Sequence, residues 1–397
     1  MSHTGFRTQV VHAGEPHEPP IGRPVATPVY ATSAFTYASM EEVERVMSGD
    51  GPGYIYTRHG NPTVAAFEDA MAALERGPVA CAYASGMAAL HAALFACGLG
   101  PGSTVLASQD LYGASFALLH KVFGAIGVKT VTADFNDLQA TRAVARAARP
   151  SVLLAESLSN PLLKLCDIEG CAAIARDGGA RLIIDNTFAS PFLCQPLALG
   201  ADFVVHSATK YLGGHGDALG GVVVACAEES RAALVSVMRL VGGVLSVWDA
   251  HLILRGVKTL ALRLERQCDN ARQVAGSLRA HPRVLRVHYP EPSPLRERVL
   301  RPPHGGALVS IELKDNTRDA AFHFMNALRL CVRLTSLGDV FTGVSHPASS
   351  SHREVPAAER ARLGITDGLV RISVGIEDIA DIQADLNQAL EAGAGQR

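Results

Sequence analysis

Short apolar runs alternate with helical patterns through the middle of the chain. Six such runs fall between residues 61 and 255: Val79–Tyr83, Thr104–Ala107, Val152–Ala155, Leu182–Ile184, Phe203–Val205 and Val222–Ala225. Strands buried on both faces are short and almost wholly apolar, and strands that alternate with helices favour parallel pairing. The pattern therefore predicts an α/β large domain over residues 61–255, with a mostly parallel sheet covered by helices.

A different pattern begins at Val257. Apolar residues recur at steps of three and four from there to Leu278, which predicts a long amphipathic helix that bridges two domains. The elements expected after it are strands at 307–313 and 369–374, helices at 317–329 and 378–391, and a proline-rich loop at 290–303. This mixture indicates a smaller α+β domain over residues 256–397.

Residues 1–60 differ from both predicted domains. They are rich in glycine, proline and polar residues, and Ser39 and Glu42 indicate one helix through a capping box. A segment of this composition cannot bury a core of its own, so we expect an arm that wraps a neighbouring subunit or the main domain. The last residues, 393–397, are expected to form a poorly ordered tail.

Composition narrows the class of protein. The 397 residues are 48% hydrophobic and 19% charged, with a net charge of −2, as in a soluble globular enzyme. Neither a nucleic-acid nor a membrane partner is expected, because a near-neutral chain lacks the basic surface that binds either. The eight cysteines show no C-x-x-C pair or zinc spacing. The first residues lack a signal pattern, so the cytoplasm is the expected location and a small molecule the expected partner.

Two of the predicted strands deliver polar groups at their carboxyl ends. Asp185 follows the strand at 182–184, and Lys210 follows the strand at 203–205. Ligands of open α/β sheets bind at this edge, so the acid and the lysine can face one ligand. Pyridoxal phosphate (PLP) needs such a set, because its aldehyde takes a lysine amine, its ring nitrogen a carboxylate, and its phosphate hydroxyls and backbone N–H groups. Lys210 is therefore predicted to form a Schiff base.

Three further segments carry polar groups, and each has an ordinary alternative. Ser85–Met87 follows a predicted strand and opens a helix, which can bind a phosphate or be a simple serine-capped turn. Arg58 could clamp a phosphate or lie on the surface, and Asn160 could bond a ring hydroxyl or form an Asn-Pro turn. The hydroxyls of Ser207 and Thr209 on the neighbouring strand end favour the phosphate interpretation of the first segment.

Motifs along the whole chain carry a resemblance to a known family. In order they are YTRHGNPT at 56–63, ASGMAAL at 84–90, DLYG at 110–113, ESLSNP at 156–161, DNTF at 185–188, HSATKYLGGHGD at 206–217, SLGD at 336–339 and VRISVGIED at 370–378. Together they resemble the Cys/Met-metabolism family of fold-type I PLP-dependent enzymes, which includes cystathionine γ-synthases, cystathionine γ-lyases and methionine γ-lyases. The resemblance implies the fold-type I PLP-dependent transferase fold and dimers or dimers of dimers (homotetramers).

The resemblance also implies a role for each matching residue. The implied roles are Lys210 as the Schiff-base lysine, Asp185 as the partner of the ring nitrogen, Tyr112 as the ring stacked on the cofactor and the proton donor to the leaving group, Asn160 at the ring hydroxyl, Gly86, Met87, Ser207 and Thr209 at the phosphate, Tyr56 and Arg58 as phosphate ligands from the neighbouring subunit, and Arg371 with Ser336 at the substrate's α-carboxylate. Taken alone, Arg371 is more often a surface arginine at a strand edge. No metal is implied.

The implied reaction is γ-elimination from a γ-substituted amino acid such as cystathionine, methionine or a homoserine derivative, giving 2-oxobutanoate and ammonia. The alternative is γ-replacement, as in cystathionine γ-synthases and O-acylhomoserine sulfhydrylases. A cofactor-free scaffold is a further alternative, which the absorption spectrum of the purified protein would test. An aminotransferase is another, which an added 2-oxo acid acceptor would reveal.

Departures from the family pattern bear on the substrate. Methionine γ-lyases carry a reactive cysteine where this chain has Ala114, and a Lys-Asp pair at the positions of Met238 and Arg239. Many members carry a glutamate where this chain has Phe341. The resemblance therefore leaves open which γ-substituent leaves, and whether elimination or replacement follows.

Overall fold

Two sheets organise the chain, and six of the seven strands of the larger one match the six predicted apolar runs. The computed structural model describes residues 5–14 and 24–392. The large sheet has the order β1-β7-β6-β5-β4-β2-β3. Its strands are β1 (Val79–Tyr83), β2 (Thr104–Ser108), β3 (Lys129–Ala133), β4 (Val152–Glu156), β5 (Arg181–Asp185), β6 (Phe203–Ser207) and β7 (Gly221–Ala225). Because β7 runs antiparallel to both neighbours and the other pairs are parallel, the predicted mostly parallel sheet is confirmed.

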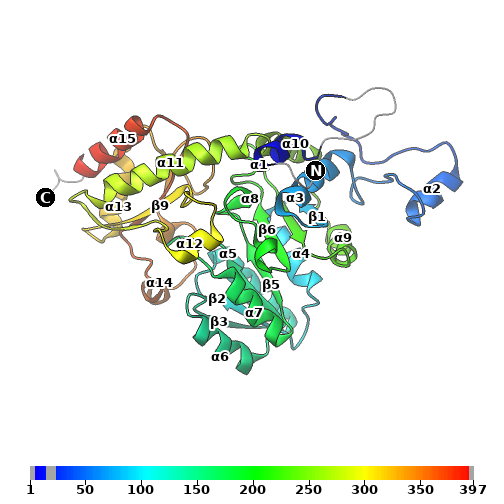
Figure 1. Cartoon of the computed structure of the whole chain (residues 1–397), viewed down its shortest axis with the longest axis horizontal. Coiled ribbons are helices and arrows are strands. Elements are labelled where there is room, and N and C mark those ends of the chain that lie inside the picture. The colour runs from blue at the N-terminus through cyan, green and yellow to red at the C-terminus, as the bar shows by residue number, and fades with distance from the viewer. Residues whose placement is uncertain (1–4, 15–23, 393–397) are drawn as a thin grey trace.

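Helices cover both faces of this sheet (Figure 1). The helices of this half of the chain are α3 (Pro62–Glu75), α4 (Gly86–Ala96), α5 (Gly113–Ala117), α6 (Leu138–Ala148), α7 (Ile168–Gly178), α8 (Ser190–Leu193), α9 (Ser230–Val241) and α10 (Val247–Val257), with short turns of other helical type at Leu118–Phe123, Gly124–Ile126 and Pro196–Leu199. Alternate side chains of one strand enter different cores. Leu153 of β4 packs in the core with α3, α7 and α10, whereas Leu154 packs in the core with α4 and α9. Strands buried on both faces explain why the runs in the sequence are apolar throughout.

The long helix α11 (Leu260–Arg279) joins the two halves of the molecule (Figure 1). Its first half, with Leu264, lies in the core of the large sheet, and its second half, with Val274, lies in the core of the small sheet. The predicted bridging helix is therefore present, but it begins at Leu260. Val257 is the last residue of α10, which Lys258 and Thr259 separate from α11.

The small sheet has the order β10-β11-β12-β9-β8. Its elements, with the helices of the same half, are β8 (Val284–His288), α12 (Pro294–Val299), β9 (Leu308–Leu313), α13 (Arg318–Ala327), β10 (Val332–Arg333), β11 (Gly343–Ser345), a short turn at Pro347–Ser349, α14 (Ala357–Leu363), β12 (Leu369–Ser373) and α15 (Ile379–Ala392). The expected loop at 290–303 is wrong in part, because Ser293 caps α12 by accepting from Arg296 N, with Pro294 in the first turn. The division into domains at residues 60 and 255 stays a prediction.

The arm has two unlike parts. Helix α1 (Phe6–His12) buries Phe6 and Val10 in the core of the large sheet, so this part packs on its own chain. Helix α2 (Met40–Met47) buries none of its residues and stands away from the body (Figure 1). Ser39 accepts a hydrogen bond from Glu42 N, which confirms the predicted helix start. The predicted tail at 393–397 lies outside the described residues.

Three global features complete the fold. No helix in the described ranges is long and apolar enough to span a bilayer. All eight cysteines are free thiols, six of them buried. Within the same ranges, no group of three or more His, Cys, Asp or Glu side chains is arranged to hold a metal ion.

Candidate active site

A cavity of about 210 Å³ opens at the carboxyl edge of the large sheet. Strands β4, β5 and β6 end at it, helix α4 begins at it, and β12 of the small sheet closes one side. The predicted residues that line it are Gly86, Met87, Tyr112, Asn160, Asp185, Ser207, Thr209, Lys210 and Arg371. Parallel strands with a common direction bring their carboxyl ends to one edge, which is why residues so distant in sequence meet here.

Lys210 is placed by the turn after β6. Its Nζ atom donates a hydrogen bond to Ser336 Oγ at 2.9 Å. Burial lowers the pKa of this amine, and the positive charge of Arg371 lowers it further, while Asp339 acts in the opposite direction. A lowered pKa favours the neutral amine, which is the form that attacks an aldehyde and accepts a proton.

Asp185 is the last residue of β5, and its Oδ1 accepts a hydrogen bond from Thr187 N at 2.9 Å. Burial raises the pKa of this carboxyl, against the bonds from Thr187 and the charge of His206. A cation bound against Asp185 would relieve that cost by stabilising the carboxylate. A protonated pyridine ring is such a cation, so this residue suits the ring nitrogen of PLP.

The start of α4 forms an anion cradle. Ser85 caps the helix by accepting from Ala88 N at 3.1 Å, which leaves the N–H groups of Gly86 and Met87 at the cavity. A Cβ atom on Gly86 would lie 2.7 Å from Ser207 Cβ, so only glycine allows the helix to approach the end of β6 this closely. Free N–H groups beside two strand-end hydroxyls suit a phosphate.

Arg371 and its neighbours form the other end of the cavity. Arg371 lies in the middle of β12 and is only 3% exposed, so the surface-arginine alternative is wrong. Its Nη1 donates to Asn160 Oδ1 at 2.7 Å and its Nη2 donates to Ser336 O at 3.3 Å, while Nε has no partner. Burial lowers the pKa of this guanidinium to about 10. No carboxylate of the described chain forms an ion pair with Arg371, so its charge is left for an anionic ligand.

Two predicted phosphate ligands lie elsewhere in their own chain. The Tyr56 and Arg58 side chains do not line the cavity, and Arg58 Nη1 donates to Arg239 O at 2.8 Å. Their placement in a neighbouring subunit's cavity stays a prediction. The positions named above where the chain departs from its relatives, Ala114, Met238, Arg239 and Phe341, do not line the cavity either.

Sequence reasoning assigned no role to several residues at the cavity. Glu156, Thr187, Phe188 and Ser351 line it, and Glu156 is the most notable because it is a second carboxylate beside Asp185. Its signal was available, since it ends the apolar run of β4 as Asp185 ends that of β5. His352 is buried behind them, and its Nδ1 bonds Ser351 Oγ at 2.9 Å.

Comparisons with known proteins agree with this geometry. The family model described as Cys/Met metabolism PLP-dependent enzyme matches residues 7–391. The chain is 43% identical to an L-methionine gamma-lyase of Pseudomonas putida over 98% of both chains, and 39% identical to a cystathionine gamma-lyase of Bacillus subtilis over 97% of this chain and 99% of the other.

A solved structure extends the comparison to the fold. The cystathionine gamma synthase of Xanthomonas oryzae pv. oryzae in complex with cystathionine superposes with a TM-score of 0.91 at 36% identity, covering 98% of this chain and 99% of the other. The fold class predicted from the pattern of strands and helices is thereby confirmed. The chain belongs to the Cys/Met metabolism family of PLP-dependent enzymes, with the fold-type I architecture of that family.

Proposed function

We propose that the enzyme catalyses γ-elimination from a γ-substituted α-amino acid such as cystathionine, methionine or a homoserine derivative, with 2-oxobutanoate and ammonia as products. One observation carries the proposal: Ser336 bonds both the Lys210 amine and the Arg371 guanidinium. The Lys210 amine, a base, and the Arg371 guanidinium, a carboxylate-binding group, thus lie on one side of the cavity with only Ser336 between them. An α-amino acid carries its Cα proton and its carboxylate on the same carbon, so both groups can engage it together.

The residues present fit PLP. When bound, PLP supplies an aldehyde for amines and a protonated ring that withdraws electrons from the substrate. Asp185 would keep the ring nitrogen protonated, and the start of α4 with Ser207 and Thr209 would hold the phosphate. Tyr112, 38% exposed at the cavity, would stack on the ring. Asn160 shares its Oδ1 with Arg371, so its amide would connect the ring hydroxyl to the substrate's carboxylate end.

The chain's own groups would then divide the proton transfers. Arg371 binds the α-carboxylate through its planar, two-pronged guanidinium. Lys210, whose pKa is lowered by burial and by the nearby guanidinium, takes the Cα proton. A Cβ proton must also be lost, because its electron pair forms the Cβ–Cγ double bond as the γ-substituent leaves, and Tyr112 gives a proton to that departing group. The exposure of Tyr112 at the cavity mouth allows a long substituent to reach it.

The alternative is γ-replacement, in which a thiol attacks where the γ-substituent left. The solved cystathionine gamma synthase relative favours it, whereas the lyase relatives favour elimination. Incubation with methionine, cystathionine and O-acylhomoserines, with and without a thiol, separates the two. Release of 2-oxo acid without a thiol supports elimination, and a new thioether without 2-oxo acid supports replacement.

We also propose that the active assembly is a dimer or a dimer of dimers in the cytoplasm. The exposed arm supports the assembly, because Tyr56 and Arg58 lie outside the cavity of their own chain. Several large apolar side chains are exposed, among them Leu240, Val241 and Trp248. Such side chains suit a subunit interface better than contact with solvent. Trp248 is not a core residue, because it is 61% exposed, and we propose that it lies in the subunit interface.

A further inference from the structure

Glu156 is a buried acid that the proposed mechanism does not use. It ends β4, is 8% exposed, and lies directly beside Asp185 in the register of β4 and β5. Burial raises its pKa well above the usual range, and the charge of Asp185 raises it further. A carboxyl group in such surroundings is costly unless its oxygens are hydrogen-bonded.

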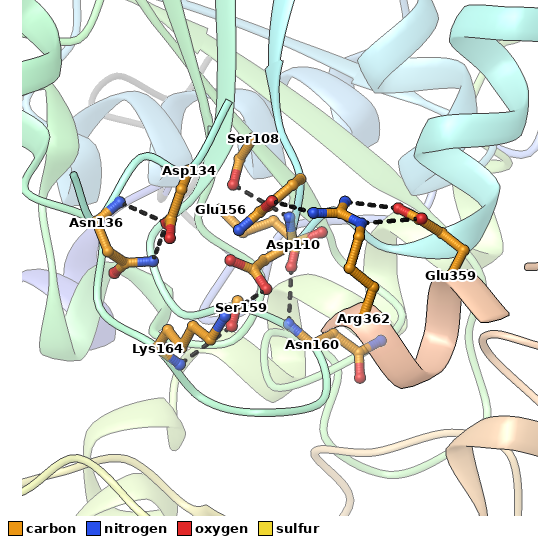
Figure 2. Close-up of polar contacts among 11 residues, drawn as sticks. Ser108, Asp110, Asp134, Asn136, Glu156, Ser159, Asn160, Lys164, Glu359 and Arg362 are labelled. Carbon is orange, nitrogen blue, oxygen red and sulfur yellow. Dashed lines mark hydrogen bonds and ion pairs between the residues drawn. The ribbon is translucent and has the colours of Figure 1, made fainter. Parts of the chain in front are cut away.

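Both oxygens of Glu156 are occupied by backbone donors from two separate loops. Oε1 accepts from Tyr112 N at 2.5 Å, and Oε2 accepts from Asn160 N at 3.0 Å (Figure 2 shows the second bond). A carboxylate has two equivalent acceptors, whereas the amide of glutamine has one acceptor and one donor group. Only an acidic side chain can therefore hold both N–H groups at once.

We propose that Glu156 is a positioning residue that fixes Tyr112 over the cofactor and Asn160 beside the substrate's carboxylate. Tyr112 supplies the stacked ring and the proton for the leaving group, and Asn160 holds Arg371. One carboxylate thus sets the distance between the two ends of the cavity. This inference rests on the proposed function, because it uses the role of Tyr112 given there.

A second connection between the same loops lies outside the first. Lys164 Nζ contacts Asp110 Oδ1 at 2.8 Å, and Lys164 N donates to Ser159 Oγ at 3.0 Å (Figure 2). The loop that carries Tyr112 and the loop that carries Asn160 are therefore joined at two places, by Glu156 and by the ion pair of Lys164 with Asp110. Because the outer ion pair holds the loops together without Glu156, loss of the inner carboxylate should shift the two residues without unfolding the site.

If the inference is right, the loss of kcat on removing Glu156 should depend on the leaving group of the substrate. A thiolate needs a proton as it departs, whereas the carboxylate released from an O-acylhomoserine is stable without one. If Glu156 acts by placing Tyr112, its loss slows the thioether substrate more than the ester. A purely structural residue would slow both equally, because it would reduce only the fraction of intact sites.

The test compares Glu156→Gln with Glu68→Gln in the holoenzyme. Glu68 is a matched control, since its Oε1 accepts from Ala82 N at 2.7 Å and burial raises its pKa to about 7, yet it does not line the cavity. For Glu156→Gln we expect kcat with methionine or cystathionine to fall about tenfold or more, and kcat with O-acetylhomoserine to fall less than about threefold. Glu68→Gln should change both values by the same factor.

A second readout does not depend on turnover. The visible circular dichroism of the bound cofactor reports how the ring is packed, so Glu156→Gln should change its intensity while Glu68→Gln should not. Wild-type circular dichroism with equal kcat losses for both substrates would overturn the inference. If the wild-type enzyme turns over neither substrate, the proposed function fails, and the circular dichroism still tests Glu156. Should Glu156→Gln not fold, Glu156→Asp keeps the charge but is too short for both donors, and wild-type behaviour of that variant would equally refute the role.

Discussion

The two ends of the cavity differ in which parts of the chain supply their residues. At the cofactor end, Asp185, Ser207 and Lys210 all come from the edge of one sheet or the turn just after it. At the substrate end, Arg371 comes from a second sheet and reaches across to Asn160 in a loop of the first half. The cofactor end is therefore fixed by one rigid element, whereas the substrate end depends on how two halves of the chain pack. Mutations at the first should affect chemistry, and mutations at the second should affect binding.

Lys210→Ala is the strongest test of the cofactor end. The variant loses the group proposed both to hold the cofactor and to accept the Cα proton, so kcat should fall by at least about 10³-fold. Borohydride should reduce the imine of the wild-type enzyme, so that its visible band is replaced by a near-ultraviolet absorbance that dialysis does not remove, whereas cofactor bound to the variant should be lost on dialysis. Full turnover in Lys210→Ala would contradict the assignment of the base.

His352 lies behind the cavity wall and tests its stability rather than its chemistry. Burial lowers the pKa of this imidazole from 6.5 to about 4, and the charges of Arg371 and Arg360 add to the shift. Between these two values the unfolded chain binds more protons than the folded one, so stability should fall as the pH drops through 6.5 towards 4. The loss expected from this one group is about 3 kcal/mol.

The measurement is urea unfolding of the apoenzyme from pH 7 to pH 4. His352→Gln should remove about 3 kcal/mol of the acid-dependent loss in the free energy of unfolding. His323→Gln, at an exposed histidine, is the matched control and should leave the pH dependence unchanged. Identical pH profiles for His352→Gln and the wild type would show that protonation of His352 does not lower the free energy of unfolding.

Arg371→Lys tests the substrate end. The ammonium group keeps the charge but cannot donate to Asn160 Oδ1 and Ser336 O while also gripping a carboxylate in two-pronged fashion. We expect KM to rise about tenfold or more, since a hydrogen bond to a charged group contributes about 1.5–3 kcal/mol. The cofactor's visible spectrum should stay unchanged. A fall in kcat with no change in KM would place Arg371 in the chemistry and would remove the contrast between the two ends.

The contrast also explains what could be predicted from the sequence. Apart from β3, the strands of the large sheet are mostly apolar on both faces, so they and the acid and lysine at their ends could be predicted from the pattern alone. Strands β3 and β8 were missed because several of their residues are exposed, which breaks the apolar run. Arg371 could be assigned only by resemblance, since no local pattern tells that a strand arginine will be buried against a loop 211 positions away. Glu156 ends an apolar run as Asp185 does, so its place at the cavity could have been predicted, but its bonds to backbone N–H groups leave no mark in the sequence.

The arm offers the finest test, because it asks whether the cavity is complete within one chain. Tyr56 and Arg58 carry the phosphate-binding motif but lie outside their own cavity. Lys210→Ala and Arg58→Ala should each weaken activity alone. In a mixed dimer, the subunit that keeps Lys210 would receive a native Arg58 from its partner, so one site of two is restored. Random mixing makes half of the dimers mixed, and activity should recover to about a quarter of the wild-type value. Activity that stays at the average of the two single variants would mean that Arg58 serves only its own chain, and the cavity would then have to close by movement of the arm.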